Sequence, residues 1–176
     1  MNRLAWILLV AMAGCAPKIP TKVAAEEYEV YSAWIRHHFA KEQPRTLYLA
    51  TRTFSWETAS TCDTKAMRKA GVDDSLARRL RELGEAEYPL NLYSRTMKIP
   101  WDFKEASGFP DRFSEDQPGT FRIVAFSRVA FNTRRTRALF AVSNICGGLC
   151  GGGGVLSGVR KDSAWTFQQT GCMWVY

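Results

Sequence analysis

The last third of the chain contains four segments with the composition of β-strands, and this feature constrains the fold most. The segments are rich in β-branched and aromatic residues and cover residues 121–131, 136–146, 153–161 and 164–176. Short polar turns separate the first pair and the last pair, and a glycine-rich stretch joins the middle two. Because consecutive strands with short connections usually pair as neighbours, we expect these four to form an antiparallel meander.

A long amphipathic helix is expected before this sheet. In residues 23–41 the apolar and aromatic side chains fall near one stripe of a helix. Thr21 is a candidate N-cap, and Pro44 prevents the helix from continuing. Residues 46–54, which are rich in Thr, Leu and aromatic side chains, indicate a further strand.

A second helix is indicated after Asp73 or Asp74, either of which can cap it, and Gly84 suits its end. Residues 64–70 are compatible with a shorter helix. Residues 85–119 contain four prolines and look irregular, although their aromatic side chains indicate an ordered covering. The chain therefore predicts an α+β fold, in which the N-terminal helix packs on a C-terminal antiparallel β-meander of about four strands, with a second helix and one more strand.

The first fifteen residues have the layout of a secretory signal. Arg3 provides a positive charge, residues 4–13 form an apolar run, and two small residues precede Cys15. As a helix, this apolar run extends about 15 Å, roughly half the thickness of the hydrocarbon core of a bilayer, so it is too short to span one. A lipoprotein signal, an ordinary cleaved signal peptide and a buried first helix are the alternatives.

Residues 11–15, Ala-Met-Ala-Gly-Cys, resemble the lipobox of bacterial lipoproteins, with Met12 at the position that Leu usually occupies. The resemblance implies that cleavage leaves Cys15 as an acylated first residue and thus a stable membrane anchor. In lipoproteins an Asp after this Cys favours the inner membrane, so Ala16 implies the outer membrane, facing the periplasm. The expected organisation is a signal peptide in residues 1–14, a tether in residues 15–20 and a single α+β domain in residues 21–176.

The number of cysteines agrees with an oxidising compartment. Lipidation of Cys15 leaves four of the five cysteines, Cys62, Cys146, Cys150 and Cys172, and four thiols are expected to form two disulfides. Three connectivities are possible. A local bridge between Cys146 and Cys150 is feasible, and Cys62 and Cys172 would then close a long loop. A zinc site is disfavoured by the Cys-x₃-Cys spacing and by the compartment.

Residues 146–154 have the most unusual local composition, with six glycines among nine residues. A phosphate-binding loop is not indicated, because such a loop opens a helix and this stretch joins two expected strands. We expect instead a turn pinned by a disulfide, in which Gly151 or Gly153 adopts a positive φ.

The same region resembles a group of uncharacterised secreted bacterial proteins. The shared pattern consists of Ser-Arg-Val-Ala-Phe-Asn in residues 127–132, Ala-Leu-Phe in residues 138–140, Cys-Gly-x-Leu-Cys-Gly in residues 146–151, Trp165 and Trp174. The resemblance implies that the C-terminal meander is a recurring unit. It implies no activity, ligand or catalytic residue.

The sequence offers no established catalytic motif, and no catalytic residue, cofactor or metal is expected. His37 and His38 are neighbours on an expected helix, where their side chains point about 100° apart and cannot chelate one ion together. Ser157 is flanked by Val at both positions where a nucleophile elbow has Gly. A Cys62 nucleophile with His38 as its base would be silenced by oxidation.

Charge and compartment narrow the partners. Removing Arg3 with the signal leaves 23 of the 24 basic residues against 17 acidic ones, a net charge of +6. This charge suits anionic envelope polymers or an envelope protein, while the compartment excludes nucleic acid. The sequence favours a non-catalytic binding or structural protein of the envelope; the alternatives are a periplasmic enzyme and an inhibitor of an envelope-targeting enzyme. A basic lysozyme as target is disfavoured, because it would select an acidic surface.

Overall fold

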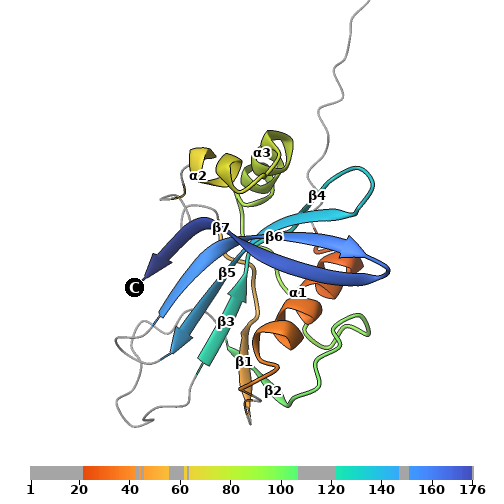
Figure 1. Cartoon of the computed structure of the whole chain (residues 1–176). Helices are drawn as coiled ribbons and strands as arrows, with labels where there is room; N and C mark the ends of the chain where they lie inside the picture. Colours follow the sequence, from red (N-terminus) through yellow and green to blue (C-terminus); the bar gives the residue numbers. More distant parts are fainter. Residues whose placement is uncertain are drawn as a thin grey trace, which may run out of the picture.

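The computed structural model describes residues 22–42, 44, 46–55, 62, 64–106, 122–146 and 151–175. This described part contains three helices on a mixed sheet of seven strands, so the α+β class is confirmed (Figure 1). The helices are α1 (Ala25–His38), α2 (Thr64–Lys69) and α3 (Asp74–Leu83). The strands are β1 (Leu47–Ala50), β2 (Phe103–Ala106), β3 (Arg122–Phe126), β4 (Ala130–Phe131), β5 (Arg137–Cys146), β6 (Gly151–Lys161) and β7 (Ala164–Val175).

The sheet has the order β2-β1-β3-β5-β6-β7, and β4 pairs with β5 outside this path. Strands β3, β5, β6 and β7 are antiparallel neighbours in succession, which confirms the expected C-terminal meander. Strand β1 lies parallel to both β2 and β3, so it extends the meander into a mixed sheet. The meander therefore forms the larger part of the sheet, and the N-terminal strand is added at its β3 side.

The strand boundaries differ from expectation in two places. Residues 121–131 form two strands, because the chain turns away after β3 and the hydroxyl of Ser127 accepts a hydrogen bond from the backbone N–H of Ala141 at 2.8 Å. The expected strand in residues 46–54 ends at Ala50. Strand β2 lies in the segment expected to be irregular. Within the described residues it pairs with β1 alone, and its exposed Lys104 and Glu105 break the apolar pattern that would indicate a strand.

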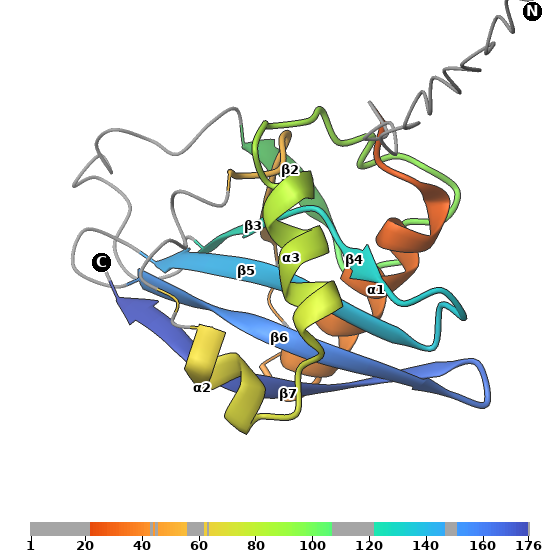
Figure 2. The same ribbon diagram turned by 90° about the horizontal axis from the view of Figure 1, so that it is seen from above.

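The helices cover opposite faces of the sheet: α1 lies on one face, and α2 and α3 lie on the other (Figure 2). Helix α1 starts after Ala24, where the Glu27 carboxylate accepts the backbone N–H of Ala24 at 3.0 Å. The expected cap Thr21 lies outside the described residues. Helix α3 is capped by Asp73, which accepts the backbone N–H of Ser75 at 2.7 Å, and ends at Gly84 as expected.

Each face of the sheet has its own apolar core. On the α1 face, the side chains of Tyr31, Trp34 and Ile35 are buried against β3, β5 and β6. On the α2–α3 face, Leu76 and Leu80 are buried near the disulfide that joins Cys62 to Cys172. This bridge spans 110 residues of sequence, with its Cα atoms 5.3 Å apart, and it confirms the expected pairing of these two cysteines.

No helix in the described residues is long and apolar enough to cross a membrane. The proposed signal, the tether with Cys15 and a bridge between Cys146 and Cys150 fall outside the described part, which includes Cys146 by its backbone only.

Candidate functional site

The described glycines of the glycine-rich segment, residues 151–154, lie inside strand β6 and not in a turn. Gly152, Gly153 and Gly154 pair with β5 on one side and with β7 on the other. The expectation of a positive φ at Gly151 or Gly153 is therefore wrong: among the described glycines, the left-handed φ angles are 76° at Gly71 and 75° at Gly171. The reason for glycine in β6 must lie in what surrounds it.

The close approach of β7 explains why these residues are glycines. A Cβ atom at Gly152 would lie 2.6 Å from the carbonyl oxygen of Trp174, and one at Gly154 would lie 2.9 Å from that of Cys172. A Cβ atom at Gly153 would overlap the indole ring of Trp174. Since Cβ atoms essentially never approach other atoms this closely, a larger residue at any of these positions forces the strands apart.

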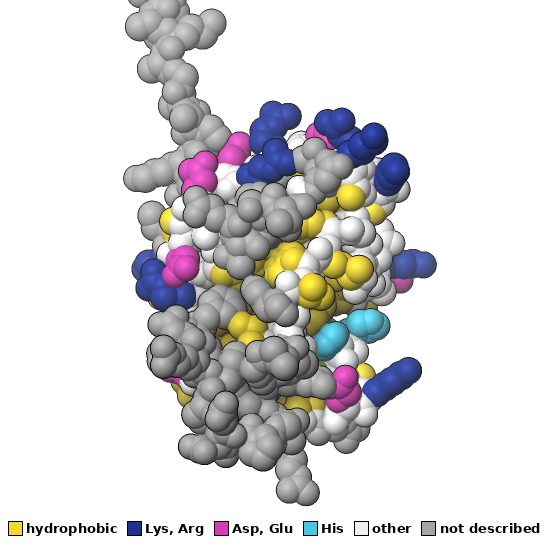
Figure 3. Space-filling model, turned by 90° about the vertical axis from the view of Figure 1, so that its left-hand side faces the viewer, with side chains coloured by type: hydrophobic (Ala, Val, Ile, Leu, Met, Phe, Trp, Pro, Cys, Tyr) yellow, Lys and Arg dark blue, Asp and Glu magenta, His cyan; other side chains and the backbone are white. Residues whose placement is uncertain are grey.

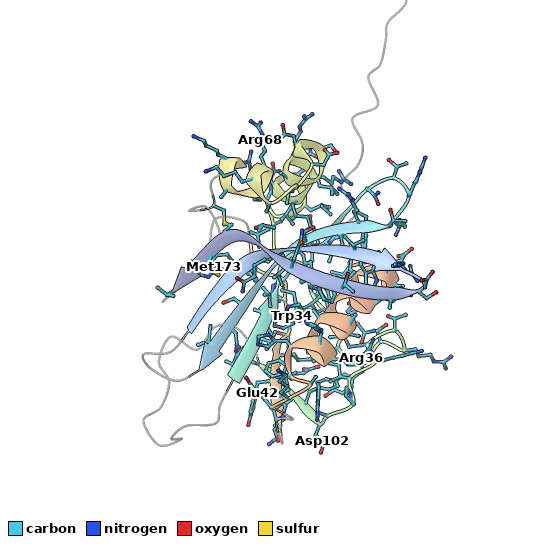
Figure 4. The ribbon with its side chains drawn as sticks, viewed as in Figure 1. Trp34, Arg36, Glu42, Arg68, Asp102 and Met173 are labelled. Carbon is cyan, nitrogen blue, oxygen red and sulfur yellow. A yellow bond between two sulfur atoms is a disulfide. The ribbon has the colours of Figure 1, made fainter. Side chains whose placement is uncertain are left out.

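The same glycines leave a hollow on the α1 face of the sheet. On this face, Asn144 and Val142 of β5 lie opposite Gly152 and Gly154, which have no side chains to pack beside them. The resulting hollow has a volume of about 330 Å³. Its walls come from the C-terminal end of α1 and from β7, and the main wall residues are Trp34, His37, His38, Phe167 and Gln169. Figure 4 shows Trp34 on α1 and Met173 on β7, and Figure 3 shows the two histidines in cyan beside apolar side chains.

Aromatic contacts hold both histidines at the walls. The ring of His38 stacks on Trp34 with the centroids 4.5 Å apart and the planes 14° apart. The ring of His37 lies against Phe167 of β7, with 6.4 Å between the centroids. The two histidines thus contact different partners, as expected for neighbours on a helix. In the described part of the chain no group of three His, Cys, Asp or Glu side chains is placed to hold a metal ion.

Asn144 carries an unmatched polar atom beneath the surface of this hollow. Its Oδ1 atom is buried and has no hydrogen-bond partner within the described residues. The Nε1 atoms of Trp165 and Trp174 are likewise buried without such a partner there. Of these three residues, Asn144 lines the hollow. An unsatisfied buried polar group costs about 1–3 kcal/mol, so this atom lowers the stability of the fold.

A second polar cluster, at the N-terminal end of α1, is fully paired. Arg128, which is 2% exposed, donates to the Glu27 carboxylate from Nε at 3.0 Å and from Nη2 at 2.8 Å. Glu27 also accepts the backbone N–H of Val129 at 2.8 Å, and Arg128 Nη2 donates to the carbonyl of Lys22 at 3.1 Å. The guanidinium lies over the ring of Tyr88 at 4.5 Å. This cluster joins the start of α1 to the segment between β3 and β4.

Burial and pairing shift two pKa values in this cluster. Burial alone would lower the pKa of the Arg128 guanidinium, but the hydrogen bonds and negative charge of Glu27 outweigh it, and the pKa is raised. Burial also raises the pKa of the Tyr31 hydroxyl well above its usual value, and the nearby Glu27 carboxylate adds to this. That hydroxyl donates to the carbonyl of Ser127 at 2.7 Å. Because every group has a partner inside the protein, we assign the cluster a structural role.

The aromatic segment that follows α3 covers the core over its described residues. Met97, Ile99 and Trp101 pack against the α1-face core, and Tyr93 is 71% exposed with its ring tilted against Phe103. The remaining aromatic residues of the segment, in residues 107–113, lie outside the described part.

Asn144 and Gln169 were not expected from the sequence to line a site. A signal was present at Asn144: the inward positions of β5 are Ala138, Phe140 and Val142, and the alternation then places a polar residue at 144. Its cross-strand neighbour is a glycine, which only the strand register reveals. No protein-family model, curated protein or solved structure matches the chain, so function is argued from this geometry.

Proposed function

We propose that this protein is a lipoprotein anchored in the bacterial outer membrane, facing the periplasm, and that it binds an envelope ligand without transforming it. The layout of the first fourteen residues, the lipobox-like residues 11–15 and Ala16 support the anchor and its membrane. The disulfide between Cys62 and Cys172 supports an oxidising compartment, since cytosolic thiols are kept reduced.

The hollow on the α1 face carries the proposed binding role. It is concave and combines aromatic walls with carboxamide side chains, a combination typical of small-molecule sites. Its polar side chains are carboxamides and imidazoles. Carboxamides donate and accept hydrogen bonds without acting as acids or bases near neutral pH, so the exposed Gln169 supports a binding role for the hollow.

Retention on purified peptidoglycan sacculi tests the binding role, using full-length protein purified in detergent. Gln169 is exposed on β7 at the hollow, so Gln169→Trp fills the hollow without changing the core. We expect this variant to lose at least tenfold in retention. Thr166→Trp, which introduces the same side chain at an exposed position of β7 outside the hollow, serves as the control and should bind like wild type. Wild-type retention of Gln169→Trp would refute the hollow as the site.

Acyl labelling tests the anchor. Cys15→Ser is expected to abolish incorporation of a labelled fatty acid and to leave an uncleaved precursor, because the thiol is the acylated group. Processing and membrane fractionation of Cys15→Ser like those of the wild type would refute the lipoprotein assignment. Separation of inner and outer membranes by density then tests the second part of the proposal.

A further inference from the structure

We propose that α2, α3 and the connection from β4 into β5 form a basic face that lies against the anionic headgroups of the membrane carrying the anchor; this inference rests on the anchor proposed above. Positive charge is distributed unevenly over the chain. The basic face, residues 64–69, 73–83 and 132–137, contains nine basic and three acidic residues. The other described residues contain eleven basic and nine acidic ones, so the excess of positive charge is concentrated on this face.

The cations of the basic face point into solvent. On α3 the buried leucines face the core, which leaves Arg78 and Arg81, three positions apart, on the outer side. Figure 3 shows Lys and Arg side chains gathered at the end of the molecule where α2 and α3 lie, and Figure 4 shows Arg68 on the side of α2 away from the sheet. Eight of the nine cations are exposed: Lys65, Arg68, Lys69, Arg78, Arg81, Arg134, Arg135 and Arg137.

Interactions between charged side chains join the three elements into one surface. Arg68 of α2 contacts Asp74 of α3, with 2.6 Å between Nε and Oδ1. The pKa of Asp73, the cap of α3, is lowered by hydrogen bonds from Ser75 and by the positive charge of Arg137 at the start of β5. The start of α3 therefore lies between α2 and the connection from β4, and the cations of all three elements belong to the same face.

Acidic residues neutralise less than half of this charge. The three acids of the face can pair with only three of its nine cations, and Glu26 of α1 pairs with a fourth, Arg135, at 2.8 Å. Five positive charges remain. Each Lys or Arg close to an anionic bilayer strengthens association roughly fivefold, so the face is suited to such a surface.

The chain enters the fold at the edge of this face, which favours the membrane over an acidic polymer or protein. The carbonyl of Lys22 accepts a hydrogen bond from Arg128 beside β4, and Glu26 in the first turn of α1 pairs with Arg135 of the basic face. Lys22 follows Cys15 by seven positions. Because an extended chain spans at most about 3.6 Å per residue, an acylated Cys15 keeps Lys22 within about 25 Å of the bilayer surface.

The contact is expected at the level of the headgroups, without insertion into the hydrocarbon. Among the described residues, the exposed large apolar side chains are Tyr93, Val159, Met173 and Val175, and none of them belongs to the basic face. Attraction between charges acts over about 8 Å at physiological salt, so the contact depends on ionic strength. In this orientation α1 and the hollow, which lie on the opposite face of the sheet, are directed away from the membrane.

Lysine acetylation tests the inference on the full-length protein, purified from bacterial membranes in detergent and added to preformed vesicles. The vesicles contain phosphatidylcholine alone or mixed with anionic phosphatidylglycerol, and peptide mass spectrometry follows the reaction. We expect Lys69 of α2 to react about fivefold more slowly on the anionic vesicles. Lys41, exposed beyond the end of α1, should react equally on both. Protection of Lys69 should disappear at about 1 M salt, where charges are screened within about 3 Å.

Charge reversal separates this face from the net charge of the protein. Arg78→Glu combined with Arg81→Glu should abolish the protection of Lys69, and the melting temperature should change little because both residues are exposed. Arg95→Glu combined with Lys98→Glu is the control: it changes the net charge equally at exposed positions of the segment that packs on α1, and protection should persist.

Equal reaction of Lys69 on both vesicles, protection that survives high salt, or protection on purified sacculi but not on anionic vesicles would overturn the membrane assignment. These outcomes leave the anchor standing if acyl labelling of Cys15 succeeds. Failed acyl labelling refutes the anchor, and salt-sensitive protection of Lys69 on anionic vesicles would then still support the basic face as a surface for lipid headgroups.

Discussion

The glycines of β6 have different surroundings on the two faces of the sheet. On the α2–α3 face, the indole of Trp174 lies over Gly153 and contacts the ring of Phe54, with 6.4 Å between centroids. On the α1 face, the side chain of Met173 lies beside Gly154, with its Cγ 3.3 Å from the position of a Cβ atom, but the space between these glycines and α1 stays open as the hollow. The α1 face can be filled in this manner, because farther along β6 the ring of Phe167 lies opposite Gly158. The difference shows that the glycines let the strands approach on one face and leave an open hollow on the other.

The largest expected effect concerns the paired cluster of the α1 face. Glu27→Ala leaves the buried guanidinium of Arg128 without its counter-charge, and we expect a loss of about 3–5 kcal/mol in the free energy of unfolding. Chemical denaturation measures it. Glu26→Ala is the matched control: Glu26 pairs with Arg135 at an exposed site, so its loss should cost under about 1 kcal/mol. Similar costs for both variants would mean that the α1 face is not held by this cluster.

The disulfide provides the corresponding test for the α2–α3 face. Replacing Cys62 and Cys172 together by Ser frees a loop of 110 residues and is expected to lower the free energy of unfolding by about 2–5 kcal/mol. Denaturation of both proteins without reductant gives the difference. Ligand retention by the folded variant should stay at the wild-type level, because the bridge lies on the face opposite the hollow. Loss of retention in folded protein would show that the two faces are coupled.

Two glycine variants compare positions in β6 that differ in the space available for a Cβ atom: Gly153, where it would overlap its neighbours, and Gly158, where it would only touch a ring. Gly153→Ala meets the Trp174 ring and lies 2.5 Å from the carbonyl oxygen of Val142, so we expect a cost of about 1–3 kcal/mol. Gly158→Ala lies 3.2 Å from the Phe167 ring, which can shift by a few tenths of an ångström. Its cost should be small, since Ala also restricts the unfolded chain. Thermal unfolding ranks the two, and a larger cost at Gly158 would contradict the close-approach explanation.

The alkaline stability of the protein depends on the α1 face. Burial raises the pKa of Tyr31, so the unfolded chain loses this proton first as the pH rises above about 10. Folding stability from this residue is therefore present below that pH and falls by up to about 1.4 kcal/mol per pH unit above it. Tyr31→Phe should remove this part of the slope in denaturation series at pH 9 to 11. An unchanged slope would indicate that the hydroxyl is accessible.

The smallest expected effect is a gain in stability at the hollow. Asn144→Leu replaces a buried atom that has no hydrogen-bond partner among the described residues, and it should raise the free energy of unfolding by about 1 kcal/mol. Melting curves of the variant and the wild-type protein measure this change. A lower melting temperature would mean that the carboxamide is satisfied in the empty protein, and the argument for an unmatched acceptor would fail.

Much of the fold could be predicted from the sequence because local patterns determine it. The alternation in β5 and β7, the Asp73 cap and the turn residues between strands each act over a few positions. The parallel pairing of β1 with β2 and β3 depends on contacts far apart in sequence, and nothing local in Phe103–Ala106 indicates it.

The site could not be predicted for a related reason. Its cavity depends on the register that sets Asn144 opposite Gly152, and a turn and a strand rich in glycine have the same composition. A turn was expected from the sequence because glycine tolerates positive φ. In the structure, glycine is required because strand β7 passes close by.

The bond from Arg128 to the carbonyl of Lys22 has a mechanical consequence for a protein tethered at its amino end, as we propose. Tension on the tether enters the fold at Lys22, just before α1. There the Arg128 guanidinium donates to the Lys22 carbonyl and to the Glu27 carboxylate. Glu27 in turn accepts the backbone N–H of Val129, so the force is transmitted to the segment between β3 and β4. The force therefore acts on this crosslink between distant segments before it can unwind the first turn of α1. Drag on the anchor is kept away from the other end of this helix, where Trp34, His37 and His38 border the hollow.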